Sequence, residues 1–298
     1  MPLVKHMITG KILKIWNSSP REWISGLQRR LRRAPGWEWE YSLPGILAGR
    51  KHLNPTSLID RWYRYWRVLE RQSPYEYRDR FKFEGRSVLE VGCGPLLGWG
   101  PFVLFKGATR FMFMEPWFRR GVLRSNEIED LYLRPLYKEL AANFRSELSA
   151  EAFCQLIHDR SCPFSNNGGP ADIILSNSTL EHIPREELPV LLQQCRAACS
   201  DDAVFIHAVD FGDHKGSDKG FGSMYDGPNR PESNLNLLRK PDIEDCLMQA
   251  GFSVDRSVVY RHAPASPSHA DWNDYALEDL QARVVLFIGR VNGDSRVG

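Results

Sequence analysis

Short apolar runs alternate with longer amphipathic stretches from Gly85 onward. Each continuous apolar run of this length predicts a buried strand. The predicted strands are Ser87–Val91, Phe111–Met114, Ile173–Leu175, Val204–His207, Val254–Tyr260 and Val284–Ile288, with a weaker one near Phe153–His158. Helices are predicted between them at Arg185–Cys199 and Asp242–Ala250, with an inserted helix around Asn126–Phe144. This alternation predicts an α/β domain with a mostly parallel sheet and helices on both faces.

The chain before Gly85 shows helical patterns. Ser19 and Glu22 have the spacing of a helix capping box, and Pro35-Gly36 ends the amphipathic stretch that follows. A second helix is predicted from Leu58 to Gln72. The sequence therefore predicts two regions, a helical N-terminal extension over residues 1–85 and an α/β domain over residues 86–298.

Charge divides the chain at the same place. Residues 1–86 hold 18 Lys and Arg against 8 Asp and Glu, whereas the whole chain has a net charge of only +2. Six of the nine Trp also lie there. Three interpretations stay open: a helical lid with solvated arginines, a peripheral contact of Lys11–Arg33 with an anionic membrane, or an RNA contact. RNA ranks last because no RNA-binding module is visible, so we do not expect a nucleic-acid partner.

Composition places the chain among ordinary globular proteins. Of its 298 residues, 42% are apolar and 26% are charged, which allows a sizeable core. No apolar run approaches the roughly 20 residues that span a bilayer, and no secretory signal is visible. The six Cys show no CxxC spacing, so we expect reduced thiols. We predict a cytoplasmic protein, with peripheral contact at the inner membrane face as a further hypothesis.

Candidate chemistry gathers at the end of the first predicted strand. The strand runs straight into Gly92-Cys93-Gly94, a turn of small residues that lets backbone approach a ligand closely. Glu115 ends the next strand, 21 residues beyond Gly94. That spacing suits a carboxylate that accepts hydrogen bonds from two ribose hydroxyls.

A Rossmann dehydrogenase would share this outline, but Leu97 stands where its G-x-G-x-x-G motif needs the third Gly. Glu90-Val91-Gly92-Cys93-Gly94 instead resembles the first motif of the class I S-adenosylmethionine-dependent methyltransferase family, an acid followed by G-x-G. The third Gly usual in that motif is Leu96 here, which is a departure. Cys162-Pro163-Phe164 and the stretch from Ala171 to Leu180-Glu181-His182-Ile183 resemble later parts of the family pattern. The resemblance covers roughly residues 86–290.

The resemblance implies a Rossmann-like methyltransferase fold with a mostly parallel, twisted, seven-stranded sheet, and S-adenosyl-L-methionine as cofactor. It also implies roles for particular residues. Gly92, Cys93 and Gly94 would pass beside the methionine and ribose, and Glu90 would reach the amino-acid portion directly or through water. Glu115 would bind the ribose hydroxyls, and Asn177 would face the sulfonium. Asp159 or its neighbour Arg160 would contact the adenine edge, with Asp159 preferred.

Two further groups are candidates for acid–base catalysis. Methyl transfer to an alcohol requires loss of a proton, which a positioned base assists. His182 follows the fourth strand, and Asp210-Phe211-Gly212-Asp213-His214 follows the fifth. The latter resembles the D-x-x-D-H stretch of bacterial methyltransferases linked to surface polysaccharides and glycolipids, whose later N-R-L-R-like element is partly matched by Asn236-Leu237-Leu238-Arg239. We take His182, Asp210 and His214 as candidate catalytic residues; capping, packing or turn roles for them stay open.

A metal site is not predicted. Some related methyltransferases use an E-x-x-E-H cluster, and Ser178 stands here where the first Glu would be. A hard divalent cation prefers several oxygen ligands, so the loss of one carboxylate argues against it. The resemblance of Asp210–His214 to the D-x-x-D-H stretch implies O-methylation of a sugar hydroxyl in a glycan, glycolipid or glycosylated metabolite. The alternatives are O- or N-methylation of another small molecule, or a cofactor-binding or membrane-docking protein without catalysis.

Overall fold

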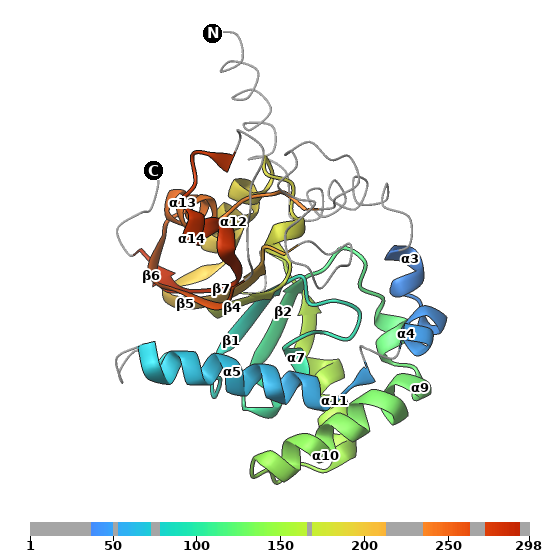
Figure 1. Ribbon diagram of the computed structural model, residues 1–298. Helices are drawn as coiled ribbons and strands as arrows, with labels where there is room; N and C mark the ends of the chain where they lie inside the picture. The colour runs from blue at the N-terminus through green and yellow to red at the C-terminus, as the bar shows by residue number, and fades with distance from the viewer. Residues whose placement is uncertain are drawn as a thin grey trace. The chain divides into compact units, whose positions relative to one another are not determined.

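The computed structural model describes residues 37–49, 53–72, 78–165, 169–212, 235–262 and 272–292 (Figure 1). One seven-stranded sheet has the order β3-β2-β1-β4-β5-β7-β6. The strands are β1 (Ser87–Val91), β2 (Arg110–Met114), β3 (Ser161–Pro163), β4 (Ala171–Asn177), β5 (Cys199–Asp210), β6 (Phe252–His262) and β7 (Ala282–Val291). The predicted α/β class with a mostly parallel sheet is confirmed.

The described residues divide into two compact parts. The first contains β1 to β3 together with the chain up to Tyr63, and the second contains β4 to β7 together with Arg64–Lys82. In the first part β1 pairs with β2 and β2 with β3, all parallel. Four of five residues are buried in both β1 and β2, as expected for strands covered on two faces.

The second part combines parallel and antiparallel pairing. β4 and β5 are parallel, so their carboxyl ends meet at the same edge. β7 runs antiparallel to both β5 and β6. Its residues Val285 to Ile288 are all fully or almost fully buried, which makes β7 a core strand.

Helices precede and connect the strands. They are α3 (Trp37–Glu40), α4 (Leu43–Gly49), α5 (Thr56–Gln72), α7 (Gly100–Phe105), α8 (Arg120–Leu123), α9 (Asn126–Ile128), π-helix η2 (Glu129–Leu133), α10 (Arg134–Asn143), α11 (Ala150–Arg160), 3-10 helix η4 (Leu180–His182), α12 (Leu188–Ala197), α13 (Lys240–Gln249) and α14 (Leu277–Gln281). The predicted helix Leu58–Gln72 corresponds to α5. The predicted insertion is three successive helical segments, α9, η2 and α10.

The prediction of a strand near Phe153–His158 is wrong, because these residues lie in helix α11. Ser149 caps this helix by accepting a hydrogen bond from the Ala152 N–H at 3.1 Å. Phe153, Cys154 and Ile157 are buried, which is the spacing of one helix face. The third strand is only the three residues Ser161–Pro163 that follow.

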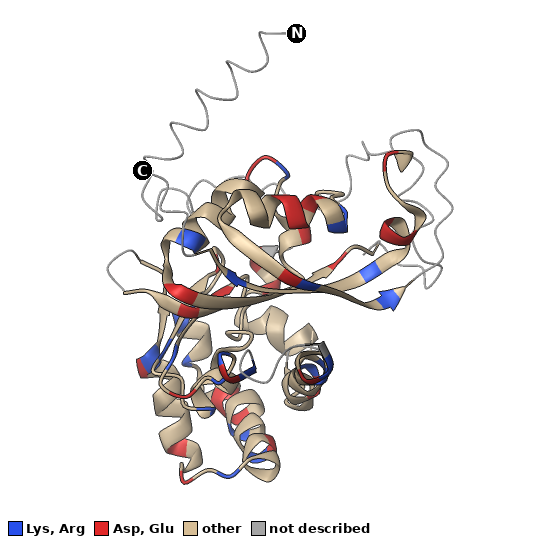
Figure 2. Cartoon of the chain, turned by 90° about the vertical axis from the view of Figure 1, so that its left-hand side faces the viewer, with Lys and Arg blue, Asp and Glu red and all other residues tan. Residues whose placement is uncertain are grey.

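Charged residues of both signs lie on the described helices and at several positions along the strands (Figure 2), with Asp255 and Arg256 inside β6. All six cysteines carry free thiols. Among the described residues, no helix is both long and apolar enough to cross a membrane. The predicted helix after Ser19 and the stretch Lys11–Arg33 lie outside the described residues.

Candidate functional site

The turn after β1 has the backbone conformation that its glycines allow. Gly92 and Gly94 have φ of 71° and 68°, in the left-handed region that disfavours other residues. The Gly92 N–H donates to Met114 O at 2.9 Å, which joins the start of the turn to the end of β2. A Cβ placed on Gly94 would meet no atom within 4 Å. The backbone is therefore open to a ligand on that side.

Glu115 lies directly against this turn. Its Oε2 accepts a hydrogen bond from the Gly94 N–H at 3.0 Å, and its Oε1 accepts one from the Trp117 N–H at 3.2 Å. The predicted association of the turn with the acid on the neighbouring strand is thus present in the structure. This arrangement fits a nucleoside, because the turn leaves room for it and the carboxylate can accept bonds from ribose hydroxyls.

Two opposing effects act on the Glu115 carboxyl group. Burial raises its pKa, whereas hydrogen bonds from Trp117, Gly94 and the Tyr41 hydroxyl lower it. Tyr41 lies between α3 and α4 and was not expected at the site. It is buried, with 6% of its surface exposed. No spacing rule connects Tyr41 with Glu115, so the sequence carried no signal for this contact.

Glu90 holds the loop that follows the Gly92–Gly94 turn. It is 1% exposed, and its Oε2 accepts a hydrogen bond from the Trp99 N–H at 2.7 Å. Burial raises the pKa of this carboxyl group well above its usual range. A Cβ on Gly98 would lie 2.5 Å from Glu90 Oε1, so the loop passes the carboxylate at a position where only Gly fits. Whether Glu90 also reaches the methionine portion of the cofactor stays a prediction.

Leu96 replaces the third Gly of the usual motif, and the residue after it has an unusual backbone conformation. Leu97 is fully buried and adopts φ of 64°, a conformation that costs a non-glycine residue about 1–2 kcal/mol. Leu96 is also buried, at 4% exposure. Cys93 is buried in the turn, and burial raises the pKa of its thiol well above the usual range. Cys93 therefore stays a thiol rather than a reactive thiolate.

Asp159 is not brought to this turn by any hydrogen bond within the described ranges. It lies exposed near the end of α11, and its Oδ1 accepts a hydrogen bond from Gln155 Nε2 at 2.9 Å. Its predicted adenine contact stays a prediction. The sequence signal placed it after a strand, and that strand is a helix.

Asn177 and His182 follow one another at the end of β4 in the second compact part. The Tyr65 hydroxyl donates to Asn177 Oδ1, and Asn177 Nδ2 donates to Ser178 Oγ at 3.4 Å. His182 ends the 3-10 turn η4 and is half-buried. Their predicted roles toward the sulfonium and the acceptor stay predictions.

Asp210 ends β5, beside an acid that sequence reasoning did not assign to the site. The Asp210 N–H donates to Glu181 Oε1 at 3.2 Å, while Asp210 Oδ1 accepts from the Gly212 N–H at 2.9 Å. Glu181 is 2% exposed, and its Oε2 has no hydrogen-bond partner among the described residues. Burial raises the pKa of Glu181 to about 8. Burial therefore favours the protonated form of Glu181.

The segment Asn236–Arg239 holds both of these strand ends. Asn236 Nδ2 donates to Leu180 O at 2.7 Å and to Ile183 O at 2.8 Å, on either side of His182. The Arg239 guanidinium is buried and donates to Phe211 O at 3.0 Å, next to Asp210. The partial motif in the sequence thus has a structural role, which its resemblance alone did not reveal.

The remaining sequence predictions concern His214 and a metal site. His214 lies outside the described residues. Within the described ranges, no group of three or more His, Cys, Asp or Glu is arranged to hold a metal ion.

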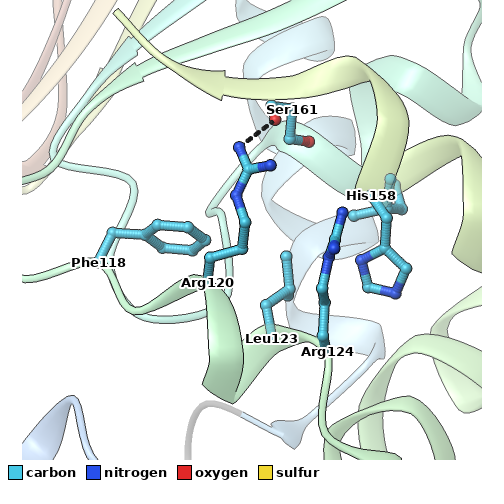
Figure 3. A pocket seen from close by; sticks show the side chains of 7 residues that line it. Phe118, Arg120, Leu123, Arg124, His158 and Ser161 are labelled. Carbon is cyan, nitrogen blue, oxygen red and sulfur yellow. Dashed lines mark hydrogen bonds between the residues drawn. The ribbon is translucent and has the colours of Figure 1, made fainter.

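A small pocket lies elsewhere in the first compact part (Figure 3). It is lined by Phe118, Arg120, Leu123, Arg124, Ile157, His158 and Ser161. Arg120 Nη2 donates across it to Ser161 O at 3.3 Å. None of the predicted site residues lines this pocket, so we assign it no part in the cofactor site.

Comparison with known proteins gives one family match. Residues 59–257 match the family model described as a methyltransferase domain. The match starts inside α5, ahead of residue 86, and covers two thirds of the chain. No curated protein sequence matches.

The similarity of this chain to solved structures is low. A TehB-like S-adenosylmethionine-dependent methyltransferase from Corynebacterium glutamicum is 9% identical, with 80% of this chain and 100% of that chain covered and a TM-score of 0.40. Magnesium protoporphyrin IX methyltransferase from Synechocystis, with bound S-adenosylhomocysteine, is 12% identical over 80% and 83% of the two chains, with a TM-score of 0.39.

Proposed function

Because this chain belongs to the methyltransferase-domain family, we propose that it is an S-adenosylmethionine-dependent methyltransferase that methylates a sugar hydroxyl of a glycan, glycolipid or glycosylated metabolite. The observation that carries the site assignment is the contact between the Gly94 N–H and the Glu115 carboxylate. It joins the open glycine turn to an acid able to accept ribose hydroxyls.

We propose that residues of the first compact part, together with Asn177 of the second, bind the cofactor. When bound, S-adenosylmethionine supplies an already activated methyl group, so the protein mainly aligns donor and acceptor. Glu115 would accept the ribose hydroxyls, and the turn Gly92–Gly94 would approach the ribose and methionine. Glu90 keeps the following loop in place through the Trp99 N–H. Asp159 and Asn177 are the residues we propose for the adenine edge and the sulfonium.

Residues of the second compact part would accept the proton that the acceptor hydroxyl loses. A hydroxyl acceptor becomes a good nucleophile only as it loses its proton. Asp210 and His182 lie at the ends of neighbouring parallel strands, and His214 follows Asp210 in the chain. Three hydrogen bonds fix the position of Asp210. Its N–H donates to Glu181, its Oδ1 accepts from the Gly212 N–H, and Arg239 donates to the carbonyl oxygen of the next residue, Phe211. The resemblance of Asp210–His214 to the D-x-x-D-H stretch favours a sugar hydroxyl as the methyl acceptor.

Transfer of labelled methyl groups tests this proposal. The full chain is incubated with methyl-labelled S-adenosylmethionine and a panel of sugars, glycolipids, glycosylated metabolites, phenols and amines. We expect label on a sugar hydroxyl, and we expect Asp210→Asn or His182→Gln to lower the rate by about 10²-fold or more. His262→Gln, at the exposed end of β6, is the matched control and should keep the rate. Label on amines or phenols only would contradict the sugar acceptor and favour another small molecule.

A peripheral membrane contact through the basic N-terminal segment is a separate proposal. It rests on the charge and Trp content of residues 1–86, most of which lie ahead of the described α5. It would suit a glycolipid acceptor. Flotation of the full chain with anionic vesicles tests it, and the absence of salt-sensitive binding would contradict it.

A further inference from the structure

Three elements of the first compact part form the pocket of Figure 3 beside the edge strand β3. Helix α8 supplies Arg120 and, one residue past its end, Arg124, while α11 supplies His158 and β3 begins with Ser161. The pocket has about 190 Å³ of empty space, counted out to its open side. Pockets for drug-sized ligands are larger, at about 300–1,000 Å³. This pocket therefore suits a small chemical group.

Two buried polar atoms at the pocket lack a hydrogen-bond partner. Ser161 is 6% exposed, and its Oγ bonds no atom of the described residues. The His158 side chain is 9% exposed, and its Nδ1 is likewise without a hydrogen bond within the described ranges. Buried polar atoms are almost always hydrogen-bonded, because leaving them unbonded is unfavourable. A ligand that bonds either atom would remove this unfavourable term.

Positive charge lines the same pocket. Arg120 and Arg124 are four residues apart, a spacing that places both side chains on one side of a helical turn. In Figure 3 they extend toward Ser161 and His158. Arg120 Nη2 donates to Ser161 O at 3.3 Å, which leaves other N–H donors of its guanidinium for a ligand. Both arginines are exposed, so their side chains can move to admit one.

The second ring nitrogen of His158 is held by an acid. His158 Nε2 lies 3.0 Å from Glu129 Oε1, and a carboxylate only accepts, so we assign a hydrogen to Nε2. Nδ1 is then an acceptor in the neutral ring and a donor in the charged ring. A hydrogen phosphate carries one O–H and several accepting oxygens. It can therefore bond Nδ1 in either state of the ring.

We propose that this pocket binds a phosphate group, either as inorganic phosphate or as part of a small phosphate monoester. The guanidinium groups of Arg120 and Arg124 would bind its outer oxygens, since guanidinium donors match the geometry of a phosphate. Ser161 Oγ and His158 Nδ1 would bond it from the buried side. The site is separate from the cofactor site and does not depend on the proposed function.

Titration calorimetry of the full chain with inorganic phosphate, at constant ionic strength, tests the site. We expect the unaltered protein to bind phosphate, and Arg120→Gln and Arg124→Gln each to bind it about tenfold more weakly. Arg119→Gln is the matched control and should keep the affinity, because Arg119 is exposed and adjacent to Arg120 but does not line the pocket. No binding by the unaltered protein, or equal losses in all three variants, would overturn the proposal.

Ser161→Ala separates a ligand contact from a structural role. Because Ser161 Oγ bonds nothing among the described residues, its removal should leave the melting temperature in phosphate-free buffer unchanged or higher. Added phosphate should raise the melting temperature of the unaltered protein more than that of the variant, since a bound ligand stabilises the folded state. A less stable variant in phosphate-free buffer, or an equal rise in both proteins, would overturn the proposal.

The same titration distinguishes this pocket from the cofactor site. Glu115 lies at the Gly92–Gly94 turn and does not line the pocket, so Glu115→Ala should bind phosphate as the unaltered protein does. A tenfold loss in Glu115→Ala would place the phosphate at the cofactor turn and would overturn the proposal.

Glycerol 3-phosphate, titrated beside inorganic phosphate, identifies the source of the group. Equal or tighter binding of the monoester, with the same loss in Arg120→Gln, assigns the pocket to a phosphorylated metabolite. Weaker binding of the monoester than of inorganic phosphate assigns it to the free ion. Failure of both to bind overturns the site.

Discussion

Gly98 decides the path of the cofactor loop at the scale of a single residue. It adopts φ of 44° and brings the backbone against the buried Glu90 carboxylate, whose Oε2 holds the Trp99 N–H. Its neighbour Leu97 also has positive φ, at 64°. Strained backbone of this kind is common at ligand-binding loops, where the surrounding contacts hold it in place. Here the support is Glu90.

Gly98→Ala should therefore destabilise the protein and weaken cofactor binding. The added Cβ would lie 2.5 Å from Glu90 Oε1, so either the carboxylate or the loop must shift. We expect a loss of about 1–3 kcal/mol in the free energy of unfolding, measured by urea denaturation. Gly121→Ala is the control, because its Cβ would meet nothing within 4 Å. An equal effect of the two substitutions would contradict the role of Gly98.

Sequence reasoning succeeded at this scale where a local rule applied. The association of Gly94 with Glu115 follows from the spacing of two strand ends in a parallel α/β unit, and the structure contains it. The contact of Tyr41 with Glu115 and the hydrogen bond from the Asp210 N–H to Glu181 join distant positions that no spacing rule connects. Such contacts depend on the folded arrangement and could not be predicted from one sequence.

At the scale of elements, the segment before α13 organises the ends of β4 and β5. Asn236 bonds both sides of the η4 turn that carries His182, while Arg239 bonds the carbonyl after Asp210. The Asn236 N–H also donates to Glu181 O at 2.8 Å. One short segment thus bonds both to the turn that carries His182 and to the residue that follows Asp210.

Asn236→Ala should loosen the η4 turn. Ile183 O would lose the Asn236 amide donor, while Leu180 O would keep only the Ile183 N–H at 3.3 Å. An unsatisfied group costs about 1–3 kcal/mol when it stays buried. We expect a lower urea midpoint for this variant and little change for Asn143→Ala, an exposed asparagine that bonds Glu139 O at 2.8 Å. A wild-type midpoint for Asn236→Ala would show that the turn holds without this side chain.

Elements were predicted well where burial produced continuous apolar runs. The predicted range of β1 matches the structure, and that of β2 differs by one residue. β3 was misplaced because it has only three residues, at the edge of the sheet, and no apolar run of its own. The apolar residues of α11 were taken for that strand, although Phe153, Cys154 and Ile157 have helical spacing.

At the scale of the whole molecule, buried carboxyl groups couple folding to pH. Burial raises the pKa of Glu90, Glu115 and Glu181. A carboxyl group with a raised pKa binds its proton more tightly in the folded than in the unfolded chain. Its stabilising contribution is complete below the unfolded pKa and is lost as pH rises through the folded pKa. For Glu181 that window runs from 4.5 to about 8.

Glu181→Gln should reduce this loss of stability at rising pH. The amide cannot ionise, so the variant should lose less thermal stability than the unaltered protein between about pH 5 and pH 8, by at most about 1.4 kcal/mol per pH unit. Scanning calorimetry at several pH values measures the difference. Glu186→Gln, at an exposed position, should follow the unaltered protein. Parallel curves for all three proteins would mean that Glu181 is ionised when folded.

The binding of the nucleoside by Glu115 is the central claim, and calorimetric titration with S-adenosylhomocysteine tests it most directly. We predict that the full chain binds the ligand and that Glu115→Ala binds it at least tenfold more weakly, a loss of about 1.4 kcal/mol, because the ribose contacts are missing. Equal affinity of the two proteins would contradict the assignment of this carboxylate and of the cofactor site built around it.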